Sequence, residues 1–337
     1  MKNYNYFLSI LFLSFLLVFA GCKKDENHVL DQNQISTQQQ RVGAQIVDGL
    51  TSNFQSWLQS HGYGSYNFLR SDISGGSFGG KINSTDPVVN QPVIFIHGNS
   101  DKALGTVYSQ TGWTASRDYF VSQGYTNAEL YGFTWGPANA LLSANQYHSY
   151  EYLSQIRAFI KAVKEYTGAS KVDIICHSMG VTLGRKAIKG GTGNDAAVGS
   201  YNLGTSLTSS VDAFVGIAGA NQGLVSCYAV NGATPTCGCT NGLYPGYLLY
   251  GLGPYGVSSF LTDINSTSHY EGSYVYSIWS SVDEVIGYGC MVYGKYTTRI
   301  PGQNGEKVYS SAPYGHFNTK DLTCDVQYQL VKNHIVP

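Results

Sequence analysis

A serine between a short apolar run and a glycine is the residue of this sequence best suited to chemistry. The stretch VDIICHSMGV, residues 172–181, leads apolar residues directly into Cys-His-Ser-Met-Gly. A parallel strand that ends on a serine and is followed at once by a helix forms a nucleophile elbow, whose sharp turn lifts the hydroxyl above the sheet. The stretch therefore predicts Ser178 as a nucleophile, and the helix N-terminus would favour negative charge beside it.

The usual pattern of such an elbow is G-x-S-x-G, and this sequence departs from it at one position. Cys176 stands where the first glycine is expected, and a cysteine is small enough to keep the logic of the turn. Gly180 is expected because the backbone of the turn crowds the following helix. The alternative is a chance Ser-Met-Gly at a strand–helix junction.

A serine is a weak nucleophile and needs a base, which in this kind of site follows the serine and the acid along the chain. Three histidines follow Ser178. His334 lies in the predicted final helix, and His269 lies in a polar loop before a strand. His316, in APYGHFNTK just before the last helix, is the predicted base; the alternative is a loop histidine with no role.

The acid that orients the base should end the strand before it. The segment YVYSIWSSVDEVIG offers Asp283 and Glu284 at a strand end. We expect Asp283, because the Ser-Ser-Val turn brings the first of the two acids to the strand tip. Asp212 begins a strand and Asp263 lies within a long connection, so both fit less well.

Two backbone N–H groups are needed to hold a developing oxyanion. One is expected from Met179, the residue after the nucleophile, and the other from Asn99 in the loop FIHGNSD after an early strand. His97 and Gly98 should shape that loop. His177 should brace the elbow rather than act as a base.

Alternating strands and helices must position these residues. Apolar β-branched runs predict strands, and apolar residues at helical spacing predict helices. The expected strands are 92–98, 128–136, 171–176, 211–219 and 273–280, and the expected helices are 150–168, the segment after Ser178, and 319–335. This order predicts an α/β fold with a mostly parallel sheet and helices on both faces.

At this point the sequence resembles the class 2 lipase family of the α/β-hydrolase superfamily. The segments QPVIFIHGNSD, KVDIICHSMGVTLGRKAI, VDAFVGIAGAN and YSIWSSVDEVIGY carry the resemblance. It implies Ser178 as nucleophile, Asp283 as acid, His316 as base, and Asn99 and Met179 as oxyanion donors. It also implies lipid or other carboxylic esters as substrates and no cofactor. The Gly/Tyr/Cys-rich insertion at 221–272 departs from the family and leaves the substrate open.

The N-terminal segment predicts export and a lipid anchor. Residues 7–20 are apolar and too short to span a membrane comfortably, as in a signal peptide. The FAGC that follows resembles a bacterial lipobox, so Cys22 is expected to carry lipid, and KKDEN resembles a signal for the surface of Gram-negative bacteria. The predicted parts are a signal peptide (1–21), a tether (22–41) and one catalytic domain (42–337). The alternative is ordinary secretion with Cys22 free.

Five of the cysteines are candidates for disulfides in an exported protein. Cys227 is expected to pair with Cys237 or Cys239, and Cys290 with Cys324. The spacing of the cysteines does not suggest a metal site. The segment GLYPGYLLYGLGPYG, with Leu248 and Leu249, reads as a wall of the acyl pocket or as a loop that packs on the core.

Composition excludes some partners and leaves two other functions open. A net charge of −1 gives no reason to expect nucleic acid, and the oligomeric state cannot be inferred. One competing function is an esterase for short esters or polyesters on the same fold. The other is a catalytically inactive surface binding lipoprotein, against which the intact Ser, Asp and His set argues.

Overall fold

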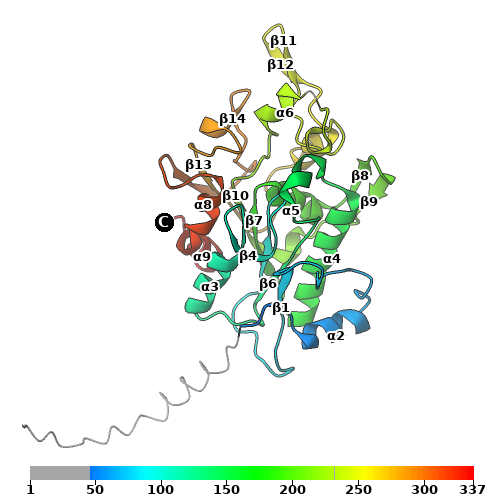
Figure 1. Ribbon diagram of the computed structural model, residues 1–337, viewed down its shortest axis with the longest axis vertical. Helices are drawn as coiled ribbons and strands as arrows, with labels where there is room; N and C mark the ends of the chain where they lie inside the picture. The colour runs from blue at the N-terminus through cyan, green and yellow to red at the C-terminus, as the bar shows by residue number, and fades with distance from the viewer. Residues whose placement is uncertain (1–45, 231) are drawn as a thin grey trace, which may run out of the picture. The chain divides into compact units, whose positions relative to one another are not determined.

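An eight-stranded sheet runs through the part of the chain that the computed structural model describes, residues 46–230 and 232–337 (Figure 1). The strand order is β1-β2-β6-β3-β7-β10-β13-β16. All neighbours from β6 to β16 are parallel, whereas β2 pairs antiparallel with β6. The strands are β1 (Gly49–Leu50), β2 (Ser77–Gly79), β3 (Val93–Ile96), β6 (Leu130–Phe133), β7 (Val172–His177), β10 (Val211–Ile217), β13 (Tyr274–Ser280) and β16 (Gly305–Tyr309). The predicted mostly parallel sheet is thus confirmed.

Helices cover both faces of this sheet because successive strand residues point to opposite faces. In β3, Val93 and Phe95 belong to the core that includes residues of α3 and α9, whereas Ile94 and Ile96 belong to the core of α4 and α5. Figure 1 shows these two helix pairs on opposite sides of the strands. The helices are α2 (Ser52–Ser60), α3 (Thr114–Ser122), α4 (Tyr150–Thr167), α5 (Met179–Lys189), α6 (Val225–Ala229), α7 (Ser259–Ile264), α8 (His316–Asp321) and α9 (Cys324–Lys332).

The longest helix, α4, follows directly from its sequence. Ser149 caps its first turn by accepting a hydrogen bond from the Tyr152 N–H at 3.2 Å. Gly168 ends it in the left-handed conformation, with φ 70°. The predicted apolar stripe is buried and comprises Leu153, Ile156, Phe159, Ile160 and Val163.

The predicted final helix, 319–335, is instead divided between α8 and α9. The Thr323 hydroxyl donates to the Thr319 carbonyl at 2.7 Å, and the Gln327 side chain donates to the Lys320 carbonyl at 2.7 Å. These carbonyls would bond to backbone N–H groups in a continuous helix, so the side chains replace the missing bonds. His316 consequently begins a helix rather than preceding one.

The segments that connect the strands and helices of the central sheet contain short hairpins and 3₁₀ turns. The hairpin strands are β4 (Leu104–Val107) with β5 (Gln110–Gly112), β8 (Thr192–Asp195) with β9 (Gly199–Asn202), β11 (Tyr247–Leu249) with β12 (Leu252–Tyr255), and β14 (Met291–Val292) with β15 (Lys295–Tyr296). The 3₁₀ turns are η1 (Ala140–Asn145), η2 (Thr208–Ser210), η3 (Pro235–Cys237) and η4 (Tyr288–Cys290).

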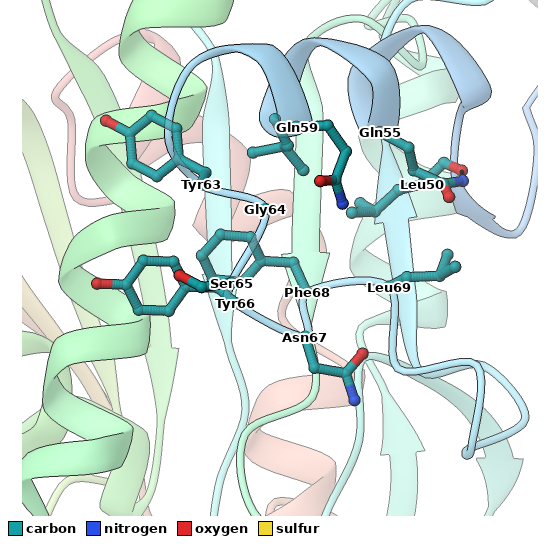
Figure 2. Close-up of a pocket in the computed structure, with 11 residues that line it drawn as sticks. Leu50, Gln55, Gln59, Tyr63, Gly64, Ser65, Tyr66, Asn67, Phe68 and Leu69 are labelled. Atoms are coloured by element: carbon teal, nitrogen blue, oxygen red, sulfur yellow. Dashed lines mark hydrogen bonds between the residues drawn. The ribbon is translucent and has the colours of Figure 1, made fainter.

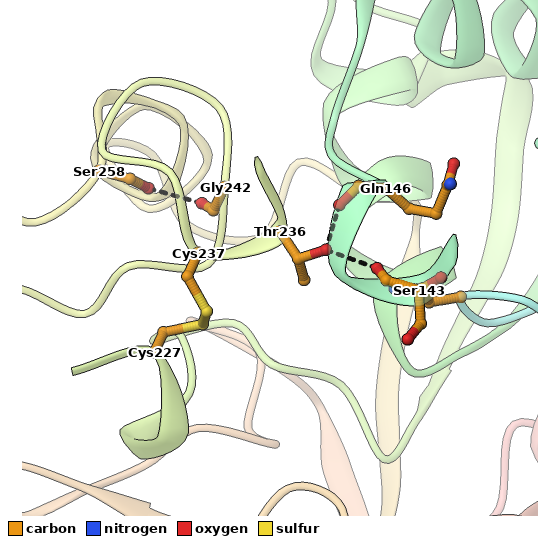
Figure 3. The surroundings of a disulfide bond; sticks show 8 residues. Ser143, Gln146, Cys227, Thr236, Cys237, Gly242 and Ser258 are labelled. Carbon is orange, nitrogen blue, oxygen red and sulfur yellow. Dashed lines mark hydrogen bonds between the residues drawn. A yellow bond between two sulfur atoms is a disulfide. The ribbon is translucent and has the colours of Figure 1, made fainter. Parts of the chain in front are cut away.

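The insertion after β10 is cross-linked and tied to the rest of the fold. Cys227 and Cys237 form a disulfide (Figure 3), one of the two pairings expected for Cys227, and Cys239 is free and exposed. Beside it the Thr236 hydroxyl donates to the carbonyls of Ser143 and Gln146. The insertion therefore rests on the segment around η1.

The predicted Cys290–Cys324 disulfide is wrong, since both cysteines are free and buried. The Cys290 thiol donates to the Ser280 carbonyl at 3.1 Å, and the Cys324 thiol to the Asp321 carbonyl at 3.3 Å. Burial raises the pKa of Cys290 to about 12 and that of Cys324 to about 11. Each thiol is therefore a small buried group with its own local acceptor.

The structure excludes one of the two predicted roles of Leu248 and Leu249, that of a loop that packs on the core, whereas the role of a wall of the acyl pocket stays a prediction. Both side chains lie on β11 and are exposed, so they do not pack on the core.

In the described residues, 46–230 and 232–337, no helix is both long and apolar enough to cross a membrane. The predicted signal peptide, the tether and Cys22 lie outside the described residues.

Candidate active site

Ser178 lies in a sharp turn between β7 and α5. Its backbone has φ 53° and ψ −128°, a conformation that residues other than glycine rarely adopt. The turn is held by the Ser178 N–H, which donates to the Ile217 carbonyl of β10 at 2.8 Å, and by the Ser178 carbonyl, which accepts from the Val181 N–H at 3.0 Å. The strand–serine–helix geometry of an elbow is therefore present.

Glycines and the one cysteine make this turn possible. A Cβ on Gly180 would lie 2.3 Å from the His97 carbonyl oxygen. A larger residue would therefore push away the loop FIHGNSD, which is called the oxyanion loop below. The sulfur of Cys176 takes the space across from Gly184, where a Cβ would approach it to 2.8 Å. The elbow thus accommodates a cysteine in place of the usual first glycine because the facing helix residue has no side chain.

Asp283 and His316 form a buried pair at the ends of neighbouring strands. Asp283 follows β13 and His316 begins α8 after β16. The His316 Nδ1–H donates to Asp283 Oδ2 at 2.8 Å, and the exposed fractions of the two side chains are 3% and 0%. Asp283 Oδ1 accepts from the N–H groups of Val285 and Ile286 at 2.9 and 2.8 Å. These bonds fix the carboxylate, and Nε2 of His316 is the ring nitrogen that has no hydrogen-bond partner within residues 46–230 and 232–337.

Two neighbours hold the backbone of His316 rather than its ring. Glu284 Oε2 accepts from the His316 N–H at 3.0 Å. His177 donates from Nε2 to the His316 carbonyl at 3.2 Å, and the two imidazole centroids are 4.6 Å apart. Burial lowers the pKa of His177 well below its usual value, so its ring is neutral. His177, the residue before Ser178, therefore contacts both the backbone and the ring of His316.

The predicted oxyanion loop lies against the elbow. A Cβ on Gly98 would lie 2.9 Å from Ser178 Cβ, which shows how closely the loop approaches the serine. His97 shapes the loop by donating from Nδ1 to the Gly98 carbonyl at 2.7 Å and accepting the Trp135 N–H on Nε2 at 3.1 Å. Burial lowers the pKa of His97 to about 4, consistent with this neutral tautomer.

The two predicted backbone donors, one in this loop and one after Ser178, are available. The Asn99 side chain is occupied, because its Nδ2 donates to the Ser143 carbonyl at 2.9 Å and its Oδ1 accepts from Ser100. The backbone N–H groups of Asn99 and Met179 donate to no acceptor among residues 46–230 and 232–337. Two free donors beside a serine suit the binding of a negatively charged oxygen.

One contact of a working site is not formed. In the described part of the chain Ser178 Oγ makes no hydrogen bond to His316, although both groups adjoin His177. Such bonds are often long in the absence of substrate and tighten in the complex. The arrangement can support attack by a hydroxyl on a carbonyl, with the histidine as base.

Sequence reasoning missed a buried ion pair beside these loops. Lys320 Nζ lies 3.0 Å from Asp101 Oδ2, and the exposed fractions of the two side chains are 0% and 1%. Asp101 is the last residue of the oxyanion loop FIHGNSD, and Lys320 lies one helical turn after His316 in α8. No local spacing predicts this pair, because 219 residues separate Asp101 from Lys320 in the sequence.

A separate cavity does not belong to this site. It has a volume of about 290 Å³ and lies between β1, α2 and the segment that follows α2 (Figure 2). None of the predicted site residues lines it. Among residues 46–230 and 232–337, no group of three or more His, Cys, Asp or Glu is placed to hold a metal ion.

The chain is similar to known lipases and esterases in sequence family and in fold. A family model described as Lipase (class 2) matches residues 90–329. Aspergillus fumigatus lipase B shares 12% sequence identity with a TM-score of 0.48, and the match covers 79% of this chain and 58% of that one. A truncated carbohydrate esterase from gut microbiota shares 14% identity with a TM-score of 0.48, over 85% and 93%. The mature Bacillus licheniformis lipase BlEst2 shares 11% identity with a TM-score of 0.45, over 76% and 97%.

Proposed function

Because this chain belongs to the class 2 lipase family of α/β-hydrolases and serine ester hydrolases, we propose that it hydrolyses acylglycerol esters through Ser178, His316 and Asp283. The observation that carries the proposal is the buried Asp283–His316 pair beside the elbow that presents Ser178. The length of the acyl chain is not part of the proposal.

The proposed mechanism is a two-step acyl transfer. His316 takes the proton of Ser178 through Nε2 as the serine oxygen attacks the ester carbonyl, and Asp283 stabilises the imidazolium that forms. The N–H groups of Asn99 and Met179 hold the oxyanion. His316 then returns the proton to the leaving alkoxide, and water attacks the acyl-enzyme in the same way.

Covalent labelling tests this proposal. A fluorophosphonate should label the parent on Ser178, because the probe reacts only with an activated serine. The Ser178→Ala variant should fold normally, remain unlabelled, and lose several orders of magnitude in ester turnover. Near-normal turnover in that variant would contradict the assignment, and an unlabelled, inactive parent would favour a binding lipoprotein.

The ratio of activities on long and short acyl esters separates a lipase from the competing esterase. A lipase should retain or gain kcat/KM as the acyl chain lengthens, because a long apolar pocket stabilises the longer chain. A sharp fall in kcat/KM beyond about four carbons would favour the short-chain esterase. Both measurements use the same protein, with Ser178→Ala as the blank for uncatalysed hydrolysis.

We also propose that Cys22 carries lipid and holds the protein at a bacterial membrane surface after export. The proposal rests on the apolar run at 7–20 that ends in FAGC. The Cys22→Ser variant should leave the membrane fraction and lose labelling by a fatty-acid analogue. An unlabelled parent, or unchanged membrane association of the variant, would refute the anchor.

A further inference from the structure

The hairpin formed by β11 and β12 presents apolar side chains to solvent. Its strands pair Tyr247 with Tyr255 and Leu249 with Leu252, in a small sheet separate from the central one. Tyr250 at the turn is 94% exposed and Leu252 is 65% exposed. Figure 1 shows the hairpin, in yellow, projecting beyond the neighbouring elements of the domain. An exposed apolar group of this kind marks an interaction surface.

The base of the hairpin is fixed, so its exposed tip is part of the folded structure. The Tyr293 hydroxyl donates to the Gly246 carbonyl at 2.7 Å, and Ser258 donates to the Gly242 carbonyl at 2.9 Å. Gly246 has φ 83°, and a Cβ there would lie 2.4 Å from the Tyr255 carbonyl oxygen. An isolated two-stranded hairpin has little stability of its own, so these anchors hold it in place.

The charge pattern indicates what the hairpin contacts. Residues 213–262 contain no Asp, Glu, Lys, Arg or His, in a chain with 20 Lys and Arg and 21 Asp and Glu. The surface therefore has no ionic means of recognising a charged partner. Tyrosine and leucine side chains on an uncharged segment suit the boundary between lipid and water, where the ring enters the apolar phase and the hydroxyl stays hydrated.

The extent of the hairpin argues against a second copy of the chain as the occupant. Tyr247–Tyr255 is nine residues long, whereas a stable protein interface takes about 20–30 residues on each side. A lipid surface, in contrast, can accept a small apolar tip. The insertion leaves the sheet at the carboxyl end of β10, the same edge at which Ser178 follows β7 and Asp283 follows β13. A surface bound by the hairpin would therefore face the site.

We propose that the β11–β12 hairpin inserts into the surface of a lipid aggregate and seats the protein with its active site toward that surface. The choice of lipid as the occupant rests on the proposed function. Docking itself requires no turnover, so it can be tested in the Ser178→Ala background. A failure of docking is thereby distinguished from a failure of catalysis, which fluorophosphonate labelling of the parent reports separately.

A local fluorescence probe tests the docking. Full-length Ser178→Ala protein has four tryptophans of its own, so its spectrum is subtracted from that of the Tyr250→Trp variant. The difference emission of Tyr250→Trp should shift to shorter wavelength on phosphatidylcholine vesicles and be quenched by brominated phosphatidylcholine. The matched control is Val198→Trp, at another exposed apolar position between the strands β8 and β9. Its emission should not change, although it shares the same N-terminus and any anchor there.

Charged substitutions sharpen the test. Adding Leu248→Glu and Leu249→Glu to the Tyr250→Trp protein should abolish the spectral shift and weaken vesicle partitioning of the hairpin by about tenfold or more. Anionic lipid or added salt should change the shift less than about twofold, because the segment is uncharged. No shift for Tyr250→Trp, or an equal shift for Val198→Trp, would overturn the proposal. A shift that grows with protein concentration without vesicles would assign the hairpin to a second copy instead.

Discussion

At the scale of single residues, the site depends on side chains that are absent as much as on those present. The positive φ of Ser178 is a strained conformation that costs about 1–3 kcal/mol. It persists because Gly98 and Gly180 let the oxyanion loop approach within distances that a Cβ would not permit. The serine is thereby held next to the two free N–H groups rather than buried in the sheet.

Two adjacent carboxylates with different partners give a test of the acid. Asp283→Asn should keep the shape but not stabilise the imidazolium, a change that lowers turnover about 10⁴-fold in a related triad. Glu284→Gln keeps an oxygen that can accept from the His316 N–H, so its loss should stay within about tenfold. Steady-state kcat/KM on one soluble ester compares the two variants. An inactive Glu284→Gln with an active Asp283→Asn would reverse the roles.

Residue types and order predicted most of this constellation, but not its supports. The elbow motif, the strand end and the chain order pointed to Ser178, Asp283 and His316, and the structure places the last two in contact. Asp283 accepts from the ring of His316 and Glu284 accepts from its backbone N–H. Which of the two acids takes which role depends on a turn of a few residues that no spacing rule describes. The acceptance of Cys176 depends on Gly184, eight residues later, which only the packing of α5 on β7 brings opposite it.

At the scale of elements, a buried ion pair joins the oxyanion loop to α8, the helix that begins at His316. Lys320 Nζ contacts Asp101 Oδ2, the Thr111 hydroxyl at 2.9 Å and the Gly112 carbonyl. Asp101 Oδ1 accepts from the N–H groups of Lys102 and Gly112 at 2.9 and 3.0 Å. The charged atoms of Asp101 and Lys320 thus have hydrogen-bond partners. The pair can therefore fix the position of α8 relative to the loop that carries Asn99.

Removing one partner of this pair should be strongly destabilising. Lys320→Met leaves the Asp101 carboxylate buried without its cation, which should lower the free energy of unfolding by about 3–5 kcal/mol. The double variant Asp101→Asn with Lys320→Met should recover part of that loss. Urea unfolding measures all three proteins. The matched control is Asp48→Asn, which breaks the exposed Arg117–Asp48 pair and should change stability by less than about 1 kcal/mol. Equal effects at both pairs would contradict a special role for the buried one.

Periodic elements were predictable from the sequence, and irregular ones were not. Helix α4 and strands β3, β7, β10 and β13 have apolar patterns long enough to identify. Strands β1 and β2, with two and three residues, carry no such pattern and form because the sheet supplies a partner. The erroneous Cys290–Cys324 pairing has the same origin, because sequence spacing does not tell which buried cysteines face each other.

At the scale of the whole molecule, several buried groups titrate abnormally. Burial lowers the pKa of His97 to about 4 and that of His148 to about 3, and it lowers the pKa of His177 as well. His148 stacks on Phe260 of the insertion and bonds to Thr182 of α5 at 2.6 Å, so its neutral ring lies between the two. Burial raises the pKa of Asp173 to about 7, which acts in the opposite sense.

These shifts predict how stability depends on pH. Each histidine has a lower pKa in the folded protein than the value of about 6.5 in the unfolded chain. Its contribution to the free energy of unfolding is therefore complete above about pH 6.5 and is lost as the pH falls toward the pKa of the folded state. Asp173 has a raised pKa, so between about pH 4 and 7 the folded state holds a proton that the unfolded state has lost, and acidification favours folding there. Among these four groups, three histidines against one aspartate leave a net uptake of about two protons on unfolding between pH 4 and 6, or a loss on the order of 3 kcal/mol per pH unit. Urea unfolding at pH 7, 6 and 5 checks the slope. His148→Gln should reduce the slope of the unfolding free energy against pH by about one proton, and Asp173→Asn should increase it by about one. A stability that rises as the pH falls from 6 to 5 would show that these histidines are not both buried and neutral.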